Sequence, residues 1–132
     1  MGDFRYGQEV SFSHSGTDVL AYASRTWGLD GEQAGRQLAA ESGWWRPQPD
    51  GSVEVLLAHP TGIVEVYVGE VTGTKIELRT DAVVRTVTAK EVTAGHRLYG
   101  LVEGALMYAV DLAAVGQPLQ PHLSARLERA GR

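Results

Sequence analysis

The sequence predicts a single all-β domain in which an up-and-down antiparallel sheet curls into a small barrel. Apolar residues recur with a period of two, rather than the helical 3.6, through most of the 132 residues. Turn-forming residues separate about nine short segments of this kind, which is the spacing of a meander. No long amphipathic helix, internal repeat or linker interrupts them. Because an open meander leaves edges and apolar surface exposed, we expect closure into a barrel that can enclose one ligand.

The first half of the chain contains five expected strands. They cover residues 4–13, 19–27, 38–46, 52–59 and 63–70. The even positions of the first strand are aromatic or aliphatic, with Gln8 as the exception. Segments 15–18, 47–51 and 60–62 are rich in Gly, Pro, Ser, Thr and Asp, so we expect them to turn the chain.

The second half contains four further expected segments. They cover residues 75–84, 89–102, 105–112 and 121–128. The second of these is either one long strand or two short ones that bend near Gly95. Glu103 and Gly104 form a tight turn. Adjacent strand residues face opposite sides, so at most one of Trp44 and Trp45 lines the interior.

Composition excludes several classes of function. The net charge is −4 and no basic patch is visible, so nucleic acid is not expected as a partner. The absence of cysteine removes disulfides and thiolate metal sites, and it fits a reducing compartment. No apolar run approaches the roughly 18 residues of a spanning helix, and no signal peptide opens the chain. We therefore expect one cytoplasmic domain, residues 1–132, with no membrane partner.

Common catalytic motifs are absent from the sequence. It has no Gly-rich phosphate loop and no HExxH motif, and Ser42 lacks the surroundings of a nucleophile elbow. The carboxylates are scattered, with no pair that stands out for acid–base work. The four histidines, at positions 14, 59, 96 and 122, lack the close spacing of a multi-histidine metal site.

His122 is the histidine whose surroundings best suit a ligand, because a Gly- and Pro-rich turn delivers it onto the last strand. Strand alternation separates its neighbours into two faces. One face carries His122, Ser124, Arg126 and Glu128, and the other carries Leu123, Ala125 and Leu127. Two interpretations stay open: a solvent-facing histidine, or an inward imidazole that binds a heme iron. The second requires an outward apolar stripe, which a second subunit could cover.

Other polar residues have similar alternatives. His59 precedes Pro60 at a turn and is expected to be a turn or edge histidine. His14, near a strand end, and His96, near the expected bend, are expected to have no special role either. Lys90 lies within the expected strand 89–102. It is either a solvated lysine or a charge partner for a ligand carboxylate.

Several stretches of the chain match a known family when taken together and in order. They are Ala40-Glu41-Ser42-Gly43-Trp44-Trp45-Arg46-Pro47, residues 53–65 (Val-Glu-Val-Leu-Leu-Ala-His-Pro-Thr-Gly-Ile-Val-Glu), Thr88-Ala89-Lys90-Glu91-Val92 and Gly116-Gln117-Pro118-Leu119-Gln120-Pro121-His122-Leu123. On these residues the chain resembles the nitrobindins, most closely the mycobacterial type. The resemblance implies a fatty-acid-binding-protein-like, lipocalin-like barrel that holds heme b, often as a homodimer. It also implies that ferric heme binds nitric oxide and isomerises peroxynitrite to nitrate.

The resemblance also implies roles for particular residues. His122 stands at the position of the proximal iron ligand and would be the catalytic and metal-binding residue, and Lys90 matches a position associated with heme contact. The expected pocket-lining residues are Leu38, Leu106, Tyr108, Val110 and Leu112.

Two departures from the family pattern bear on these expectations. Family members open with a Gly-x-Trp-x-Gly-x-Gly strand, whereas this sequence begins at Met1 after that point, so about nine of ten strands are expected. Many members carry a distal histidine where this chain has Ala39, which implies a more apolar sixth-ligand site. Two other functions stay open: a heme-free carrier of apolar small molecules, and an inactive shortened member.

Overall fold

The chain folds into one antiparallel sheet of nine strands. The computed structural model describes residues 6–14, 16, 18–29, 34–114 and 116–128, with residues 6 and 121–123 described by their backbone alone. The strands are β1 (Tyr6–His14), β2 (Leu20–Gly28), β3 (Gln37–Pro47), β4 (Ser52–His59), β5 (Ile63–Thr72), β6 (Lys75–Arg85), β7 (Val92–Val102), β8 (Ala105–Ala114) and β9 (Gln120–Leu127). Each strand pairs with the next in chain order, which confirms the predicted meander.

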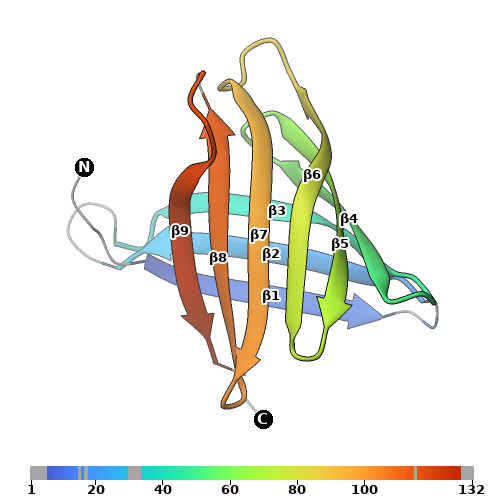
Figure 1. Cartoon of the computed structure of the whole chain (residues 1–132). Helices are drawn as coiled ribbons and strands as arrows, with labels where there is room; N and C mark the ends of the chain where they lie inside the picture. Colours follow the sequence, from blue (N-terminus) through green and yellow to red (C-terminus); the bar gives the residue numbers. More distant parts are fainter. Residues whose placement is uncertain (1–5, 15, 17, 30–33, 115, 129–132) are drawn as a thin grey trace.

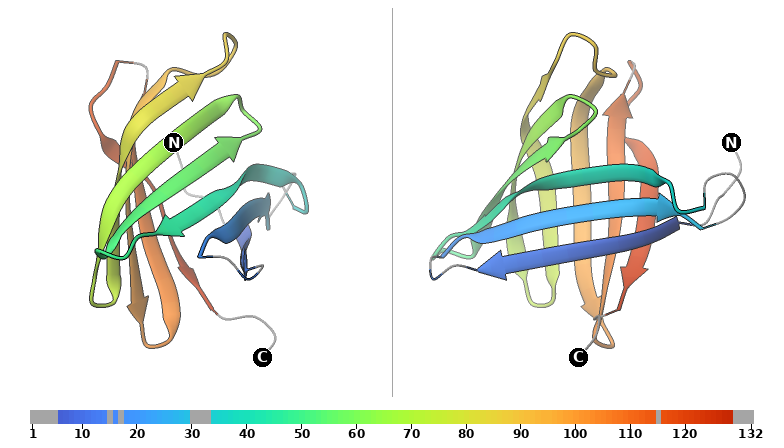
Figure 2. Two further views of the ribbon diagram at one scale, coloured as in Figure 1. Left: turned by 90° about the vertical axis from the view of Figure 1, so that its right-hand side faces the viewer. Right: turned by 180° about the vertical axis from the view of Figure 1, so that it is seen from behind.

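The sheet curls so that its two ends face each other across an interior. Strands β1, β2 and β3 cross behind β7, β8 and β9 at a steep angle (Figure 1), and the side view shows the curvature that joins these layers (Figure 2). Among the described residues, β1 pairs only with β2 and β9 only with β8. Where a backbone ladder between β1 and β9 would close the barrel, the Tyr108 hydroxyl on β8 instead donates a hydrogen bond to Gln8 Oε1 on β1. The barrel is therefore nearly closed, and a side-chain bond spans its seam.

Strand alternation decides which side chains are buried. Val53, Val55 and Leu57 of β4 are buried, whereas Leu56 between them is exposed. Trp45 is 6% exposed and Trp44 is 52% exposed, as adjacent positions on one strand require.

The apolar core fills one end of the barrel. Its buried members are Tyr22, Trp45, Val53, Val55, Leu57, Tyr67, Leu78 and Tyr99. Trp45 meets Tyr99 edge-on with ring centroids 5.2 Å apart, and Tyr99 stacks on Tyr108 at 5.6 Å. Tyr22, Trp45, Val53, Leu78 and Tyr99 stand near the hairpins β1–β2, β3–β4, β5–β6 and β7–β8, and the opposite end is left for a cavity.

The expected segment 89–102 contains one strand rather than two, and that strand is shorter than expected. β7 begins at Val92, so Lys90 lies in the preceding loop and not in a strand as the sequence suggested. The expected bend survives as a register irregularity between Val92 and Ala94, beside Gly95.

The turn between β7 and β8 has the predicted position and a specific geometry. Glu103 and Gly104 both have positive φ angles, 53° and 80°. Two residues in this conformation match the twist of the flanking strands, as in the type I′ hairpin.

Candidate functional site

A cavity of about 650 Å³ occupies the end of the barrel opposite the apolar core. It lies where β2 leads to β3, β4 to β5, β6 to β7 and β8 to β9. Its volume falls within the range of about 300–1,000 Å³ that is usual for sites of small molecules and cofactors.

The lining divides into an apolar and a polar zone. The apolar zone consists of Leu38, Ala39, Ala40, Ile63, Val92, Val110, Leu112 and Ala114. Several of these stand near strand ends at the mouth, beside the polar residues Gln37, Thr61, Lys90, Gln117 and Gln120. The polar zone includes Gln8, Ser24, Thr26, Glu41, His59, Glu65, Arg97 and Tyr108. Arg97 and Tyr108 of this zone reach the core, where both contact Tyr99.

The structure brings together most of the residues expected at the site. The cavity is lined by Leu38, Lys90, Tyr108, Val110 and Leu112. Leu106 lies elsewhere: it is the second residue of β8, at the opposite end of that strand, and it packs against the apolar core.

The side chain of His122 lies outside the described residues, but its backbone belongs to β9. Val110 pairs with Leu123 and Asp111 pairs with Pro121, so His122 is the extra residue at a register shift. A bulge of this kind interrupts the two-residue alternation and re-aims a side chain.

The expected outward stripe on β9 is wrong for the residues that the structure describes. Ala125 and Leu127 are partly buried and pair with Tyr108 and Leu106, whose side chains face the interior. Because the register shifts at His122, the orientation of these residues does not fix the side on which the histidine lies.

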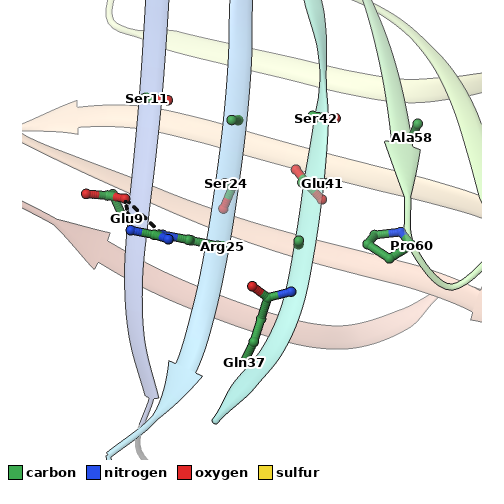
Figure 3. Close-up of a pocket in the computed structure, with 11 residues that line it drawn as sticks. Glu9, Ser11, Ser24, Arg25, Gln37, Glu41, Ser42, Ala58 and Pro60 are labelled. Atoms are coloured by element: carbon green, nitrogen blue, oxygen red, sulfur yellow. Dashed lines mark hydrogen bonds and ion pairs between the residues drawn. The ribbon is translucent and has the colours of Figure 1, made fainter. Parts of the chain in front are cut away.

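A groove of about 300 Å³ lies on the outer face of β1 to β4 (Figure 3). Its outward residues alternate with those that line the cavity. They are Glu9, Ser11, Ala23, Arg25, Ser42 and Ala58. Arg25 and Glu9 form an ion pair at 2.9 Å across β1 and β2.

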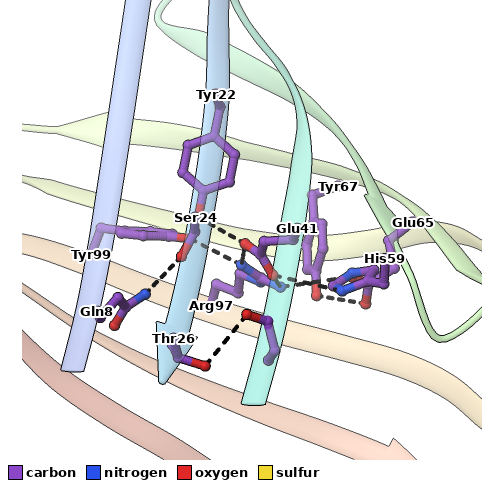
Figure 4. Close-up of polar contacts among 11 residues, drawn as sticks. Gln8, Tyr22, Ser24, Thr26, Glu41, His59, Glu65, Tyr67, Arg97 and Tyr99 are labelled. Atoms are coloured by element: carbon purple, nitrogen blue, oxygen red, sulfur yellow. Dashed lines mark hydrogen bonds and ion pairs between the residues drawn. The ribbon is translucent and has the colours of Figure 1, made fainter. Parts of the chain in front are cut away.

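Four charged or polar side chains from four strands meet at the inner end of the cavity, and we call Glu41, His59, Glu65 and Arg97 the charged cluster (Figure 4). Arg97 donates from Nη1 and Nη2 to the two oxygens of Glu41 at 2.7 and 2.9 Å. His59 Nε2 lies 2.6 Å from Glu65 Oε1, and its Nδ1 lies 3.8 Å from Glu41 Oε1. The cluster thus ties β3, β4, β5 and β7 together across the interior.

Tyrosines complete the cluster. The Tyr22 hydroxyl donates to Glu41 at 2.7 Å, and the Tyr67 hydroxyl donates to Glu65 at 2.9 Å. The Arg97 guanidinium carbon lies 5.1 Å from the centre of the Tyr67 ring, within cation–π range.

These contacts set the ionisation of the cluster. Burial alone would raise the pKa of the Glu41 carboxyl, but the Arg97 charge and the hydrogen bonds from Arg97 and Tyr22 hold it below its ordinary value. Burial would lower the pKa of Arg97, and Glu41 more than offsets this, so the pKa is raised. Burial also raises the pKa values of Tyr22 and Tyr67. Glu41 and Arg97 therefore stay charged, and both phenols stay available as donors.

Sequence reasoning missed this cluster. It treated the carboxylates as scattered and His59 as a turn or edge histidine, whereas the His59 side chain is only 19% exposed and contacts two carboxylates. One signal was present: Glu65 shares a strand face with Ile63 and Tyr67, where an isolated charge is unusual.

The described part of the chain has no group of three or more His, Cys, Asp or Glu residues placed to hold a metal ion. It also has no helix long and apolar enough to span a bilayer.

Comparisons with known proteins agree with the geometry. A family model described as a THAP4-like, heme-binding beta-barrel domain matches residues 1–129. A protein of Salinispora arenicola named peroxynitrite isomerase is 56% identical over 135 residues, which cover 98% of this chain and 69% of that protein. A protein of Kineococcus radiotolerans named ferric nitrobindin-like protein is 50% identical, with 96% of this chain and 78% of that protein covered.

A solved structure shows the same architecture. The crystal structure of Rv2717c from M. tuberculosis superposes with a TM-score of 0.85 at 41% identity, covering 97% of this chain and 82% of that chain. The family expected from the sequence is confirmed: the chain belongs to the THAP4-like, heme-binding β-barrel family.

Proposed function

We propose that the chain binds heme b in its cavity and, with ferric iron, isomerises peroxynitrite to nitrate and binds nitric oxide. The observation that carries the proposal is the cavity itself, whose lining combines aliphatic side chains with a few polar groups and whose rim adjoins the bulge at His122. Relatives at 50–56% identity that are named peroxynitrite isomerase support the choice of reaction.

The residues present fit a flat apolar cofactor with charged edges. Leu38, Val110 and Leu112 offer aliphatic contacts for a macrocycle, and the exposed Lys90 can pair with a peripheral carboxylate. His122 is the proposed iron ligand. When bound, heme would supply an iron that can bind small nitrogen oxides.

The polar residues keep their own roles in this proposal. Ala39 lines the cavity without a donor, which leaves the region beside it apolar. Gln8 donates to Ser24 at 2.9 Å and accepts from Tyr108, so these groups are already satisfied and hold the wall in place.

The ligand assignment is tested by replacing the histidine. His122→Ala is expected to abolish the Soret shift that hemin produces in the unmodified chain. His96→Ala is the matched control, because His96 bonds Glu77 on β6 and lies outside the cavity lining. If His122→Ala binds hemin with the unmodified spectrum, the assignment is wrong.

The reaction is tested by stopped-flow absorbance with nitrate and nitrite quantified. The hemin-loaded chain is expected to consume peroxynitrite faster than free hemin does and to raise the share of nitrate. Decay no faster than with free hemin would exclude the isomerase function, and an unchanged Soret band under nitric oxide would exclude binding of that ligand.

A heme-free carrier of apolar molecules is the alternative that the cavity also allows. The charged cluster argues against a fatty-acid carrier, because Arg97 already pairs with Glu41 at 2.7 Å and with Glu65 at 3.7 Å, and a ligand carboxylate would add a third negative charge beside one buried cation. Solvent extraction and mass spectrometry of the purified protein separate the two functions: a stoichiometric lipid supports the carrier.

We also propose a homodimer that covers part of the outer face of the sheet. Trp44, Leu56, Val66 and Ala82 are consecutive cross-strand partners on β3 to β6, and Trp44 and Leu56 are 52% and 38% exposed. Sedimentation velocity is expected to show a dimer for the unmodified chain and a monomer for Leu56→Arg. A monomer in both cases would rule the dimer out.

A further inference from the structure

The wall of the barrel is interrupted between β3 and β4. β3 begins at Gln37, but its pairing with β4 begins only at Ser42, opposite Ala58. Continuing that register would place Ala40 opposite Pro60, and proline has no N–H to donate to a ladder. Residues 37–41 therefore have a strand partner on the β2 side alone, within the described chain.

The outer groove and the cavity meet at this interruption. Five residues line both hollows: Ser24, Gln37, Ala40, Glu41 and Pro60. In the close-up, Gln37 and Glu41 stand on β3 and Pro60 stands across from them at the end of β4 (Figure 3). The two hollows thus approach the same stretch of wall from opposite sides.

The chemistry of the interruption suits water and small polar solutes. Backbone groups on the unpaired side of β3 need hydrogen-bond partners, and water supplies them at a surface. The shared lining adds the polar side chains of Ser24, Gln37 and Glu41. The groove, at about 300 Å³, holds several molecules of water size, since one water takes about 30 Å³ of liquid volume.

Charge does not bar an anion from this region. Glu9 pairs with Arg25 at 2.9 Å on the outer side, and Glu41 pairs with Arg97 at 2.7 Å on the inner side. Each of these two carboxylates therefore has a guanidinium partner, and Glu65, farther inside, lies 3.7 Å from the same Arg97.

We propose that this interruption, the β3–β4 window, is a lateral route by which water and small nitrogen oxides or oxoanions reach the inner cavity while a large cofactor fills the mouth. The nature of that cofactor and of the solutes rests on the proposed function. The route itself follows from the register and from the shared lining.

The first experiment measures azide association with the hemin-loaded protein by stopped-flow absorbance. Ala40→Trp places an indole in the shared lining and is expected to slow association by at least about fivefold. Ala109→Trp makes the same change at an exposed position of β8 that lines neither hollow, and it should match the unmodified chain. Gln37→Ala removes a shared side chain and is expected to raise the rate. Equal rates in all these proteins would overturn the window.

The second experiment needs no heme. The chain has no cysteine, so Ser24→Cys introduces a single thiol in the shared lining. Iodoacetamide is expected to label it at least about threefold more slowly in the Ala40→Trp background than in the Ala109→Trp background. Equal labelling overturns the window. Failure of every variant to bind hemin overturns the proposed function instead, and the labelling result still decides on the window.

Discussion

Arg97 is the buried cation that pairs with the carboxylates inside the barrel. Its side chain is 6% exposed, it reaches across the barrel from β7, and it bonds both oxygens of Glu41 on β3. Neither residue looked notable in the sequence, because the two lie 56 positions apart and only the curled sheet brings them together. A buried pair of this kind is costly to break, since each partner leaves the other as an uncompensated charge.

Arg97→Met is expected to lower the free energy of unfolding by about 3–5 kcal/mol, because it leaves Glu41 buried without its cation. Glu41→Gln in the same background removes the orphaned charge, so the double variant should lose less than the sum of the single losses. Urea denaturation of the four proteins measures this coupling. Strictly additive losses would show that the two side chains act independently.

Acid stability tests the ionisation of Glu41. Its pKa is lowered in the folded chain, so the ionised carboxylate stabilises the fold above the unfolded value, near 4.5. That contribution is lost as the pH falls through the lower folded value. The melting temperature should therefore drop more steeply below about pH 4.5 in the unmodified chain than in Glu41→Gln. If the melting temperatures of the two proteins fall equally steeply with falling pH, the lowered pKa of Glu41 is contradicted.

At the scale of elements, alternation located the strands but not the face that each turns inward. In β5 the run Val64, Val66 and Val68 looks like a core face, yet Val64 and Val68 are 46% and 37% exposed, and Glu65 and Tyr67 on the other face are buried. Both faces of this strand are apolar enough to suit a core, so the choice is made by the strands it meets. For the same reason the sequence missed the inward face of β3 that carries Glu41.

Close packing of β3 against β4 gives a test at this scale. A Cβ atom at Gly43 would lie 1.7 Å from the Leu56 carbonyl oxygen, so the backbone would have to move. Gly43→Ala is expected to cost about 1–3 kcal/mol or more. Gly100→Ala is the control, because its Cβ would meet only the Thr74 oxygen at 3.9 Å, and it should be neutral or slightly stabilising. Similar melting temperatures for the two variants would refute the strand packing.

At the scale of the whole molecule, one end of the barrel is filled and the other is hollow. Aromatic rings from Tyr22, Trp45 and Tyr99 pack the first end, the charged cluster crosses the middle, and the cavity opens beyond it. Local alternation in the sequence predicted the meander and its nine strands. The family resemblance pointed to Leu38, Lys90, Tyr108, Val110 and Leu112, which line the cavity. The sequence missed the charged cluster because Arg97 on β7 lies 56 positions from Glu41 on β3. It missed the β3–β4 window because alternation does not show where the pairing of two neighbouring strands stops.

The central claim is that this hollow end holds one heme. A visible absorption titration of the purified chain with hemin tests it most directly. We expect a Soret shift that saturates at one equivalent and is lost in Val110→Trp, which fills the apolar zone of the lining. A spectrum that stays that of free hemin at every ratio, or a shift that Val110→Trp leaves unchanged, would contradict it.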